Sequence, residues 1–258
     1  MFRPIASWMV AVLMVAGGLW TFAAPAAQDE KDSRSILREA ENHFSEVDPD
    51  GLGLAYVLIV TETRPNGRKD TESLEILSDN NSAVARYLTP KTLRGDVLLK
   101  RGATFRVRMH DDNRLTQTVQ HRHLTKYLGF RLLPLITTDL TNEYGLVSVT
   151  QETVDGRVAL RFSLQEQKMA TVFERVNIWV DKETHRPLRS TFLDEDTGET
   201  FELRYEFDER TAEFAPGRRF VSAIECRISG TEQRIRLEFQ DMRRIPDSVI
   251  YAQMREVN

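Results

Sequence analysis

The fold of this chain is decided by residues 170–207, which read ATVFERVNIWVDKETHRPLRSTFLDEDTGETFELRYEF. From Phe201 to Phe207 every second residue is aromatic or aliphatic, and the residues between them are charged. Such a period of two is typical of a β-strand that buries one face and exposes the other. Residues 194–198, which combine acidic residues with a glycine, indicate a hairpin turn before this strand. The stretch therefore predicts antiparallel strands joined by short turns.

The same alternation extends outward from this stretch, over residues 54–109 and residues 146–241. The alternating segments are separated by short turn signals, of which Asp155-Gly156 is a typical two-residue hairpin. The spaces between strands are too short for the crossover helices that a parallel sheet requires. We therefore expect a mainly β chain with about ten to eleven antiparallel strands.

A sheet of this many strands with one apolar face is expected to curl around that face. The predicted architecture is a half-open antiparallel β-barrel with a few short helices covering the open side. Two segments suit that covering role. Apolar residues recur at helical spacing from Ile36 to Phe44, and residues 123–135 mix both periods around Pro134. Either these segments fill the interior, or a cavity remains for an apolar ligand.

The N-terminus has the composition of an export signal. Arg3 precedes an uncharged stretch over residues 5–27, and Ala24-Pro25-Ala26 supplies the small residues that signal peptidase requires. We therefore expect a signal peptide over residues 1–26 and a single periplasmic domain over residues 27–258. The alternative is an uncleaved inner-membrane anchor, because the uncharged stretch is long enough to span a bilayer.

Several classes of protein are disfavoured by the composition and by the missing motifs. The net charge of −4 argues against a nucleic-acid-binding protein, which usually carries a basic excess. The sequence has no phosphate-binding loop, no dinucleotide fingerprint and no nucleophile elbow, so we predict neither a cofactor nor an enzyme. The single cysteine, Cys226, alternates with Ile224 and Ile228, and this predicts a buried structural thiol.

One cluster of residues is similar in composition to a metal site. His110, Asp111, Asp112, His121 and His123 are close in sequence, and the last two histidines would share a face on a strand. They match no fixed ligand motif, so a polar hairpin and loop facing water is the favoured interpretation and no metal is predicted. A metal site there is the alternative.

Three further segments resemble a known family. They are residues 86–102, which contain RYLTP and RGDVLLK, residues 176–189, which contain VNIWVDK and PLR, and residues 239–247, which read FQDMRRIPD. Together they resemble the outer-membrane lipoprotein-sorting protein family, related to the LolA/LolB-like carriers and to the lipid-sensing domain of the RseB/MucB regulators. The resemblance spans residues 33–256. It implies a half-open barrel whose apolar inner face, covered by helices, shields acyl chains crossing the periplasm.

The resemblance and the apolar strand faces lead to one favoured function. We expect a periplasmic carrier that shields the acyl chains of a lipid or acylated protein and passes it between envelope partners, with an inner-membrane transporter or an outer-membrane acceptor as the expected protein partner. The alternative is a lipid-sensing or protein-interaction module that regulates an envelope membrane protein, and a hydrolase is the least favoured class. The predicted ligand contacts are the apolar strand residues Leu58, Val60, Phe105, Val107, Phe162, Ile178, Leu203, Tyr205 and Phe239.

Overall fold

The computed structural model describes residues 27–44, 52–79, 82–102, 104–110, 115–119, 121–167, 171–208 and 220–257. The expected signal peptide and the residues Asp111 and Asp112 lie outside these ranges. The strands are β1 (Leu52–Thr63), β2 (Lys69–Ser78), β3 (Ser82–Thr89), β4 (Val97–Arg101), β5 (Thr104–Arg108), β6 (Leu115–Val119), β7 (Tyr144–Val154), β8 (Arg157–Glu166), β9 (Arg175–Asp181), β10 (Pro187–Asp194), β11 (Glu199–Phe207), β12 (Val221–Ile228) and β13 (Arg234–Pro246). The helices are α1 (Ala27–Glu41), η1 (His121–Lys126), α2 (Leu128–Leu132), α3 (Pro134–Thr137), α4 (Leu140–Glu143) and α5 (Asp247–Val257).

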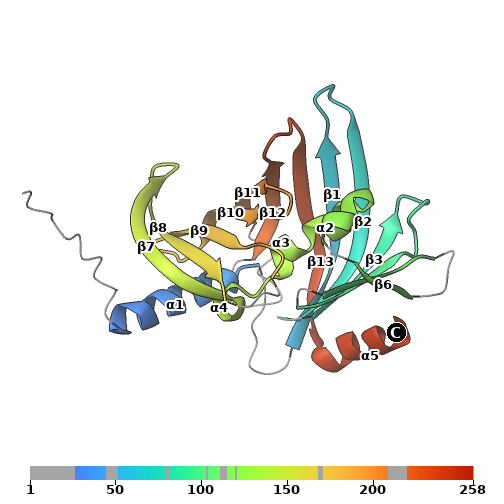
Figure 1. Cartoon of the computed structure of the whole chain (residues 1–258), viewed down its shortest axis with the longest axis horizontal. Coiled ribbons are helices and arrows are strands. Elements are labelled where there is room, and N and C mark those ends of the chain that lie inside the picture. The colour runs from blue at the N-terminus through green and yellow to red at the C-terminus, as the bar shows by residue number, and fades with distance from the viewer. Residues whose placement is uncertain are drawn as a thin grey trace, which may run out of the picture.

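The strands form one antiparallel sheet that does not close. Its order within the described ranges is β6-β5-β4-β3-β2-β1-β13-β12-β11-β10-β9-β8-β7, so β6 and β7 are the two edges. The first and last strands meet in the middle, where Leu58 of β1 lies opposite Phe239 of β13. Figure 1 shows the two halves of the sheet curving around a shared interior. The predicted half-open antiparallel barrel is confirmed.

The described part of the chain has thirteen strands, which is more than the ten to eleven expected. β4, β5 and β6 have only five residues each, and the first two fall within residues 54–109, where the alternation had been expected. The irregular stretch after β6 holds η1, α2, α3 and α4, so four short helices occupy the region in which residues 123–135 were expected to cover the sheet.

The core lies on the inner, concave face of the sheet. Leu58 and Val60 of β1 are fully buried, and so are Leu74 and Ile76 of the adjacent β2. The helices η1 to α4 pack against this face, and Figure 1 shows α2 and α3 lying between the two halves of the sheet. The interior is therefore largely filled by side chains from the sheet and its covering helices.

A further helix, α5, packs on the opposite, convex face. Its Ile250 and Met254 contact a small cluster that includes Val84, Val97 and Leu99. These three residues alternate with the concave-face residues of β3 and β4, so both faces of the sheet are apolar at this point. No helix was expected in this segment from the sequence. Among the described residues, no helix is both long enough and apolar enough to cross a membrane.

Candidate functional site

The nine predicted ligand contacts lie on one face of the sheet, in one apolar cluster. Eight of them are buried, with exposed fractions between 0% and 7%. Tyr205 is the exception, because it is partly buried at the margin of the cluster. The alternation therefore places the set correctly on the concave face. Whether these residues contact a ligand stays a prediction, since in this structure they pack against other side chains.

The segment from His121 to Glu143 covers this face, and we call it the cover segment. Its aromatic residues pack closely on the sheet: the ring centroids of Phe130 and Tyr87 are 4.5 Å apart. Gly129 of α2 approaches β2 so closely that a Cβ atom there would lie 2.5 Å from Cδ1 of Leu74. The covering helices thus dock without a gap at this point.

Buried polar groups of the sheet also anchor the cover segment. Glu72 of β2 accepts hydrogen bonds from the backbone N–H of Gly129 at 2.9 Å and from the Tyr87 hydroxyl at 2.8 Å. Burial raises the pKa of Glu72, an effect that the two hydrogen bonds oppose. Lys100 of β4 is 1% exposed and donates from Nζ to the carbonyl oxygen of Thr137 at 2.9 Å. Burial lowers the pKa of Lys100.

A third anchor joins the cover segment to α1. The Glu41 carboxylate accepts from the backbone N–H of Leu140 at 2.6 Å and from the Thr141 hydroxyl at 2.5 Å. Burial, and then the negative charge of Asp139, raise the pKa of Glu41 to about 8. The α1–α4 contact is therefore built around a carboxyl group that is partly protonated near neutral pH.

His121, which was expected in a polar hairpin facing water, is instead 8% exposed. It begins η1, with Nε2 2.7 Å from the carbonyl oxygen of Arg131 and Nδ1 3.4 Å from the Asp194 carboxylate. Its ring packs against Phe173 and Phe201, which explains the burial. That expectation was wrong, because the partners of His121 come from distant parts of the chain.

The three histidines of the suspected metal cluster do not come together. His110 pairs through Nδ1 with Asp96 at 2.7 Å, His121 is buried, and His123 is exposed. No group of three metal-ligating side chains is present in the described part of the chain.

A cavity of about 400 Å³ opens beside Tyr205, and we call it the Tyr205 pocket. Leu188, Tyr205 and Phe207 supply its apolar and aromatic lining. The ring of Phe44, just after α1, stacks on Tyr205 with centroids 5.7 Å apart. The remaining lining residues are Val154, Asp155, Arg157, Arg186 and Arg204.

The Tyr205 pocket combines an apolar lining with a basic rim. Arg186 lies over the Phe207 ring at 5.6 Å from its centroid, and Arg204 is 3.9 Å from the Asp155 carboxylate. Of these residues the sequence predicted only Tyr205 as a ligand contact. Phe207 could have been added, since it continues the same alternation. The arginines could not, because charged residues between apolar ones indicate only a solvated face.

The chain has the architecture of LolA-type proteins: one open antiparallel sheet whose apolar concave face is covered by helices. No protein-family model matches the sequence, and no curated protein matches it. Solved structures do match. A LolA superfamily protein from Nitrosomonas europaea aligns with a TM-score of 0.67 and 19% identity, over 84% of this chain and 96% of that one.

Two other solved structures support the same fold. A chain described as an outer membrane lipoprotein-sorting protein domain, from Vibrio parahaemolyticus, aligns with a TM-score of 0.63 and 13% identity, over 86% of this chain and 97% of that one. A DUF1329 family protein from Desulfovibrio piger aligns with a TM-score of 0.60 and 15% identity, over 83% of this chain and 92% of that one. The predicted resemblance is thus confirmed at the level of the fold.

Proposed function

We propose that this protein is an envelope carrier that shields the acyl chains of a lipid or acylated protein on its concave face and passes it between membrane partners. The Tyr205 pocket carries the proposal. It opens beside the apolar cluster that holds the other predicted contacts, and its Tyr205 is stacked by Phe44, which lies just after the covering helix α1. Binding alone, without a catalytic step, is the proposed activity.

Burial of an acyl chain supplies free energy that can replace apolar contacts of the covering elements. Each buried CH₂ contributes about 0.8 kcal/mol, so a chain of roughly fifteen methylenes contributes about 12 kcal/mol. The cover segment is held by a few hydrogen bonds, each contributing about 0.5–1.5 kcal/mol net, and by buried apolar side chains such as Phe130 and Leu133, whose contacts with the sheet the acyl chain would take over. We therefore propose that a ligand enters at the Tyr205 pocket and extends along the concave face as α1 and the cover segment move outward.

The rim of the pocket favours an amphiphile with a negative head group. Arg157, Arg186 and Arg204 surround the apolar lining, and Asp155 is the one acid among the described lining residues. Asp181 lies 3.8 Å from Arg157, and Glu202 lies 3.6 Å from Arg204. Guanidinium groups bind phosphate and carboxylate oxygens through paired N–H donors. An anionic lipid or acylated molecule would place its chain on Tyr205 and Phe207 and its head group among these arginines.

The proposed carrier is a single domain of residues 27–258 in the periplasm, exported by residues 1–26. Fractionation of cells that express the full chain, followed by N-terminal sequencing of the exported product, tests this. Recovery in the periplasm with Ala27 at the N-terminus supports the proposal. Recovery in the inner membrane with residues 1–26 retained contradicts it.

Native mass spectrometry with lipid extraction tests the carrier function. The mature protein is purified from a bacterial periplasm without detergent. A discrete, releasable amphiphile of stoichiometric mass supports the carrier. A clean apo mass, with no uptake of added phospholipid or fatty acid, contradicts it and favours an interaction module with a filled core.

Two variants make the test specific for the pocket. Leu188→Arg places a charge in the apolar lining, and Val147→Arg makes the same chemical change at a side chain that is 62% exposed on β7. We expect Leu188→Arg to lose the bound amphiphile and Val147→Arg to retain it. Thermal unfolding of both variants shows whether each is folded. Equal retention by two folded variants would place the ligand elsewhere.

A further inference from the structure

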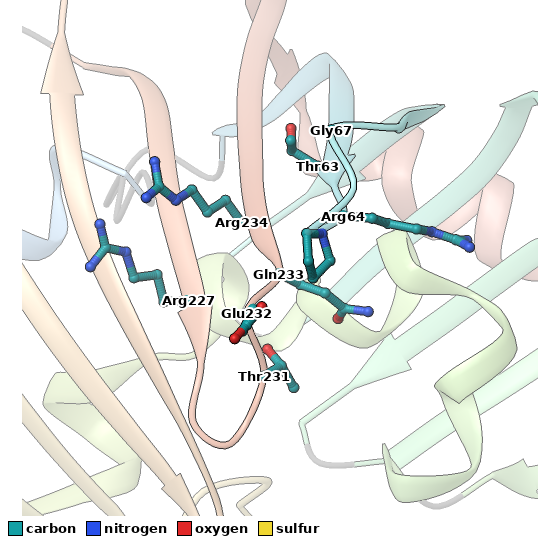
Figure 2. Close-up of a pocket in the computed structure, with 9 residues that line it drawn as sticks. Thr63, Arg64, Gly67, Arg227, Thr231, Glu232, Gln233 and Arg234 are labelled. Carbon is teal, nitrogen blue, oxygen red and sulfur yellow. The ribbon is translucent and has the colours of Figure 1, made fainter.

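A second cavity lies between the tips of two hairpins, and we call it the hairpin hollow. Its volume is about 580 Å³. The β1–β2 hairpin contributes Thr63, Arg64, Pro65 and Gly67, and the β12–β13 hairpin contributes Arg227, Thr231, Glu232, Gln233 and Arg234. Figure 2 shows these side chains around the two tips. The hollow shares no lining residue with the Tyr205 pocket.

Two arginines occupy directly opposed positions in this hollow. Arg227 of β12 is the register partner of Arg234 of β13, and both are exposed. Figure 2 shows both guanidinium groups projecting to the same side of the β12–β13 hairpin. Like charges directly opposite each other on adjacent strands destabilise a sheet. The folded protein therefore holds two positive charges together at a cost to its own stability.

The next pair of residues on the same face of these two strands is arranged in the opposite way. Arg236 lies opposite Glu225, with Nη1 2.7 Å from the carboxylate, and it also pairs with Glu206 at 2.8 Å and Glu238 at 3.2 Å. In the described part of the chain no carboxylate pairs with Arg227 or Arg234. Arg236 is thus paired with three carboxylates, whereas Arg227 and Arg234 are paired with none among the described residues.

Of the acidic residues near the hollow, Glu202 pairs with other arginines and Glu232 is exposed to solvent. Glu202, the β11 partner of Arg227, lies 3.4 Å from Arg189 and 3.6 Å from Arg204. Glu232 of the β12–β13 turn is exposed and makes no ion pair among the described residues.

The third arginine of the hollow has acidic partners of its own. Arg64 is 2.8 Å from Asp70 and 3.7 Å from Glu62. Arg227 and Arg234 are therefore the two cations of the hollow that remain available to an anion.

We propose that the hairpin hollow binds a phosphate group between Arg227 and Arg234. Two adjacent guanidinium groups present paired N–H donors that match phosphate oxygens, and the bound anion removes their mutual repulsion. Thr63, the register partner of Arg234 on β1, adds a hydroxyl that can donate to the same anion. The phosphate belongs either to a lipid head group at a membrane surface or to a free phosphate compound. The site does not depend on acyl binding at the concave face.

The test compares a double variant of the pair with a control of equal charge. Arg227→Gln/Arg234→Gln removes the proposed site. Arg94→Gln/Arg243→Gln removes two exposed arginines that do not line the hollow. Because non-specific attraction of anions depends on net charge, both double variants lose it equally. Calorimetry measures the binding of inorganic phosphate and glycerol 3-phosphate, and co-sedimentation measures binding to phosphatidylglycerol vesicles.

We expect the Arg227/Arg234 variant to lose binding at least tenfold and the control to stay within twofold of the wild type. Tight binding of soluble phosphate identifies a free phosphate compound. Vesicle binding that inorganic phosphate does not compete away identifies a lipid head group. Equal loss in the two double variants, or no binding of any of the three probes by the wild type, overturns the proposal. The pair variant is expected to fold, since it removes a repulsion, and circular dichroism checks this.

Discussion

The ring of Phe44 stacks on the ring of Tyr205, with centroids 5.7 Å apart and planes inclined by 19°. The two residues are far apart in sequence, and their contact closes α1 onto the end of the concave face beside the Tyr205 pocket. Phe44 is 7% exposed, so the contact is desolvated. On the entry route proposed above, this pair would link the stability of the α1 contact to the access of a ligand.

Substitution of Phe44 by alanine should separate these two effects. Loss of a buried phenylalanine side chain costs about 3 kcal/mol of the free energy of unfolding, which urea denaturation measures. The same change removes the ring that stacks on Tyr205, so the uptake of a fluorescent fatty acid should become faster if the ligand enters there. Phe44→Leu is the control, since it keeps most of the apolar volume. Slower uptake by the alanine variant would argue against entry at this pocket.

Glu41 predicts a pH dependence for the contact between α1 and α4. Its pKa is raised from 4.5 to about 8 in the folded protein, so the folded state binds a proton that the unfolded state has already released. The associated stabilisation is complete below the unfolded pKa and is lost as the pH rises through 8. The free energy of unfolding should fall by up to about 1.4 kcal/mol per pH unit across that range.

Urea denaturation at pH 5.5, 7 and 8.5 measures this slope. Glu41→Gln keeps the carbonyl oxygen that accepts from Leu140 and removes the titration. The variant should therefore show a flatter profile and exceed the wild type in stability at pH 8.5. A variant whose profile parallels that of the wild type would show that another group causes the dependence.

The face assignments of the long strands and the segments that cover the sheet could be predicted from the sequence, but the contacts that hold the cover in place could not. Phe162 and Ile178 are opposed in the register and both fully buried, as the alternation of two long strands implied. Lys100 is also buried on the concave face, although a charged side chain predicts exposure to solvent. Only the tertiary structure supplies Thr137 as its partner, 37 residues later.

The individual helices of the cover segment could not be delimited, for a related physical reason. Helix α3 has four residues, and a helix this short has no period to detect, because its stability comes from packing. The burial of His121 could not be predicted either, because its carboxylate partner lies 73 residues later in the chain. Local sequence therefore predicts faces well and predicts contacts between distant segments poorly.

Cys226 offers a native probe of the concave face. The thiol is fully buried, and burial raises its pKa to about 12, so almost no thiolate is present at pH 8. Ellman's reagent should label it very slowly in the native protein and completely in denaturing urea. Rapid labelling of the native protein would show that β12 is exposed in solution, in contradiction of the packed core.

The close approach of Gly129 to Leu74 predicts how the cover can be loosened. A Cβ atom at residue 129 would lie 2.5 Å from Cδ1 of Leu74, so Gly129→Ala must push α2 away from β2. We expect a loss of about 1–3 kcal/mol in the free energy of unfolding, as for other overpacked cores. We also expect weakening of the hydrogen bond from the Gly129 N–H to Glu72, with faster labelling of Cys226 and faster uptake of a fluorescent fatty acid.

A double-mutant cycle makes this prediction specific. Leu74→Ala alone should be destabilising, because it removes a fully buried side chain. In the Gly129→Ala background the smaller residue at 74 makes room for the new methyl group, so the double variant should be less destabilised than the sum of the single ones. Additive losses would show that Leu74 does not confine α2, and an unchanged uptake rate in Gly129→Ala would show that the ligand enters without movement of the cover segment.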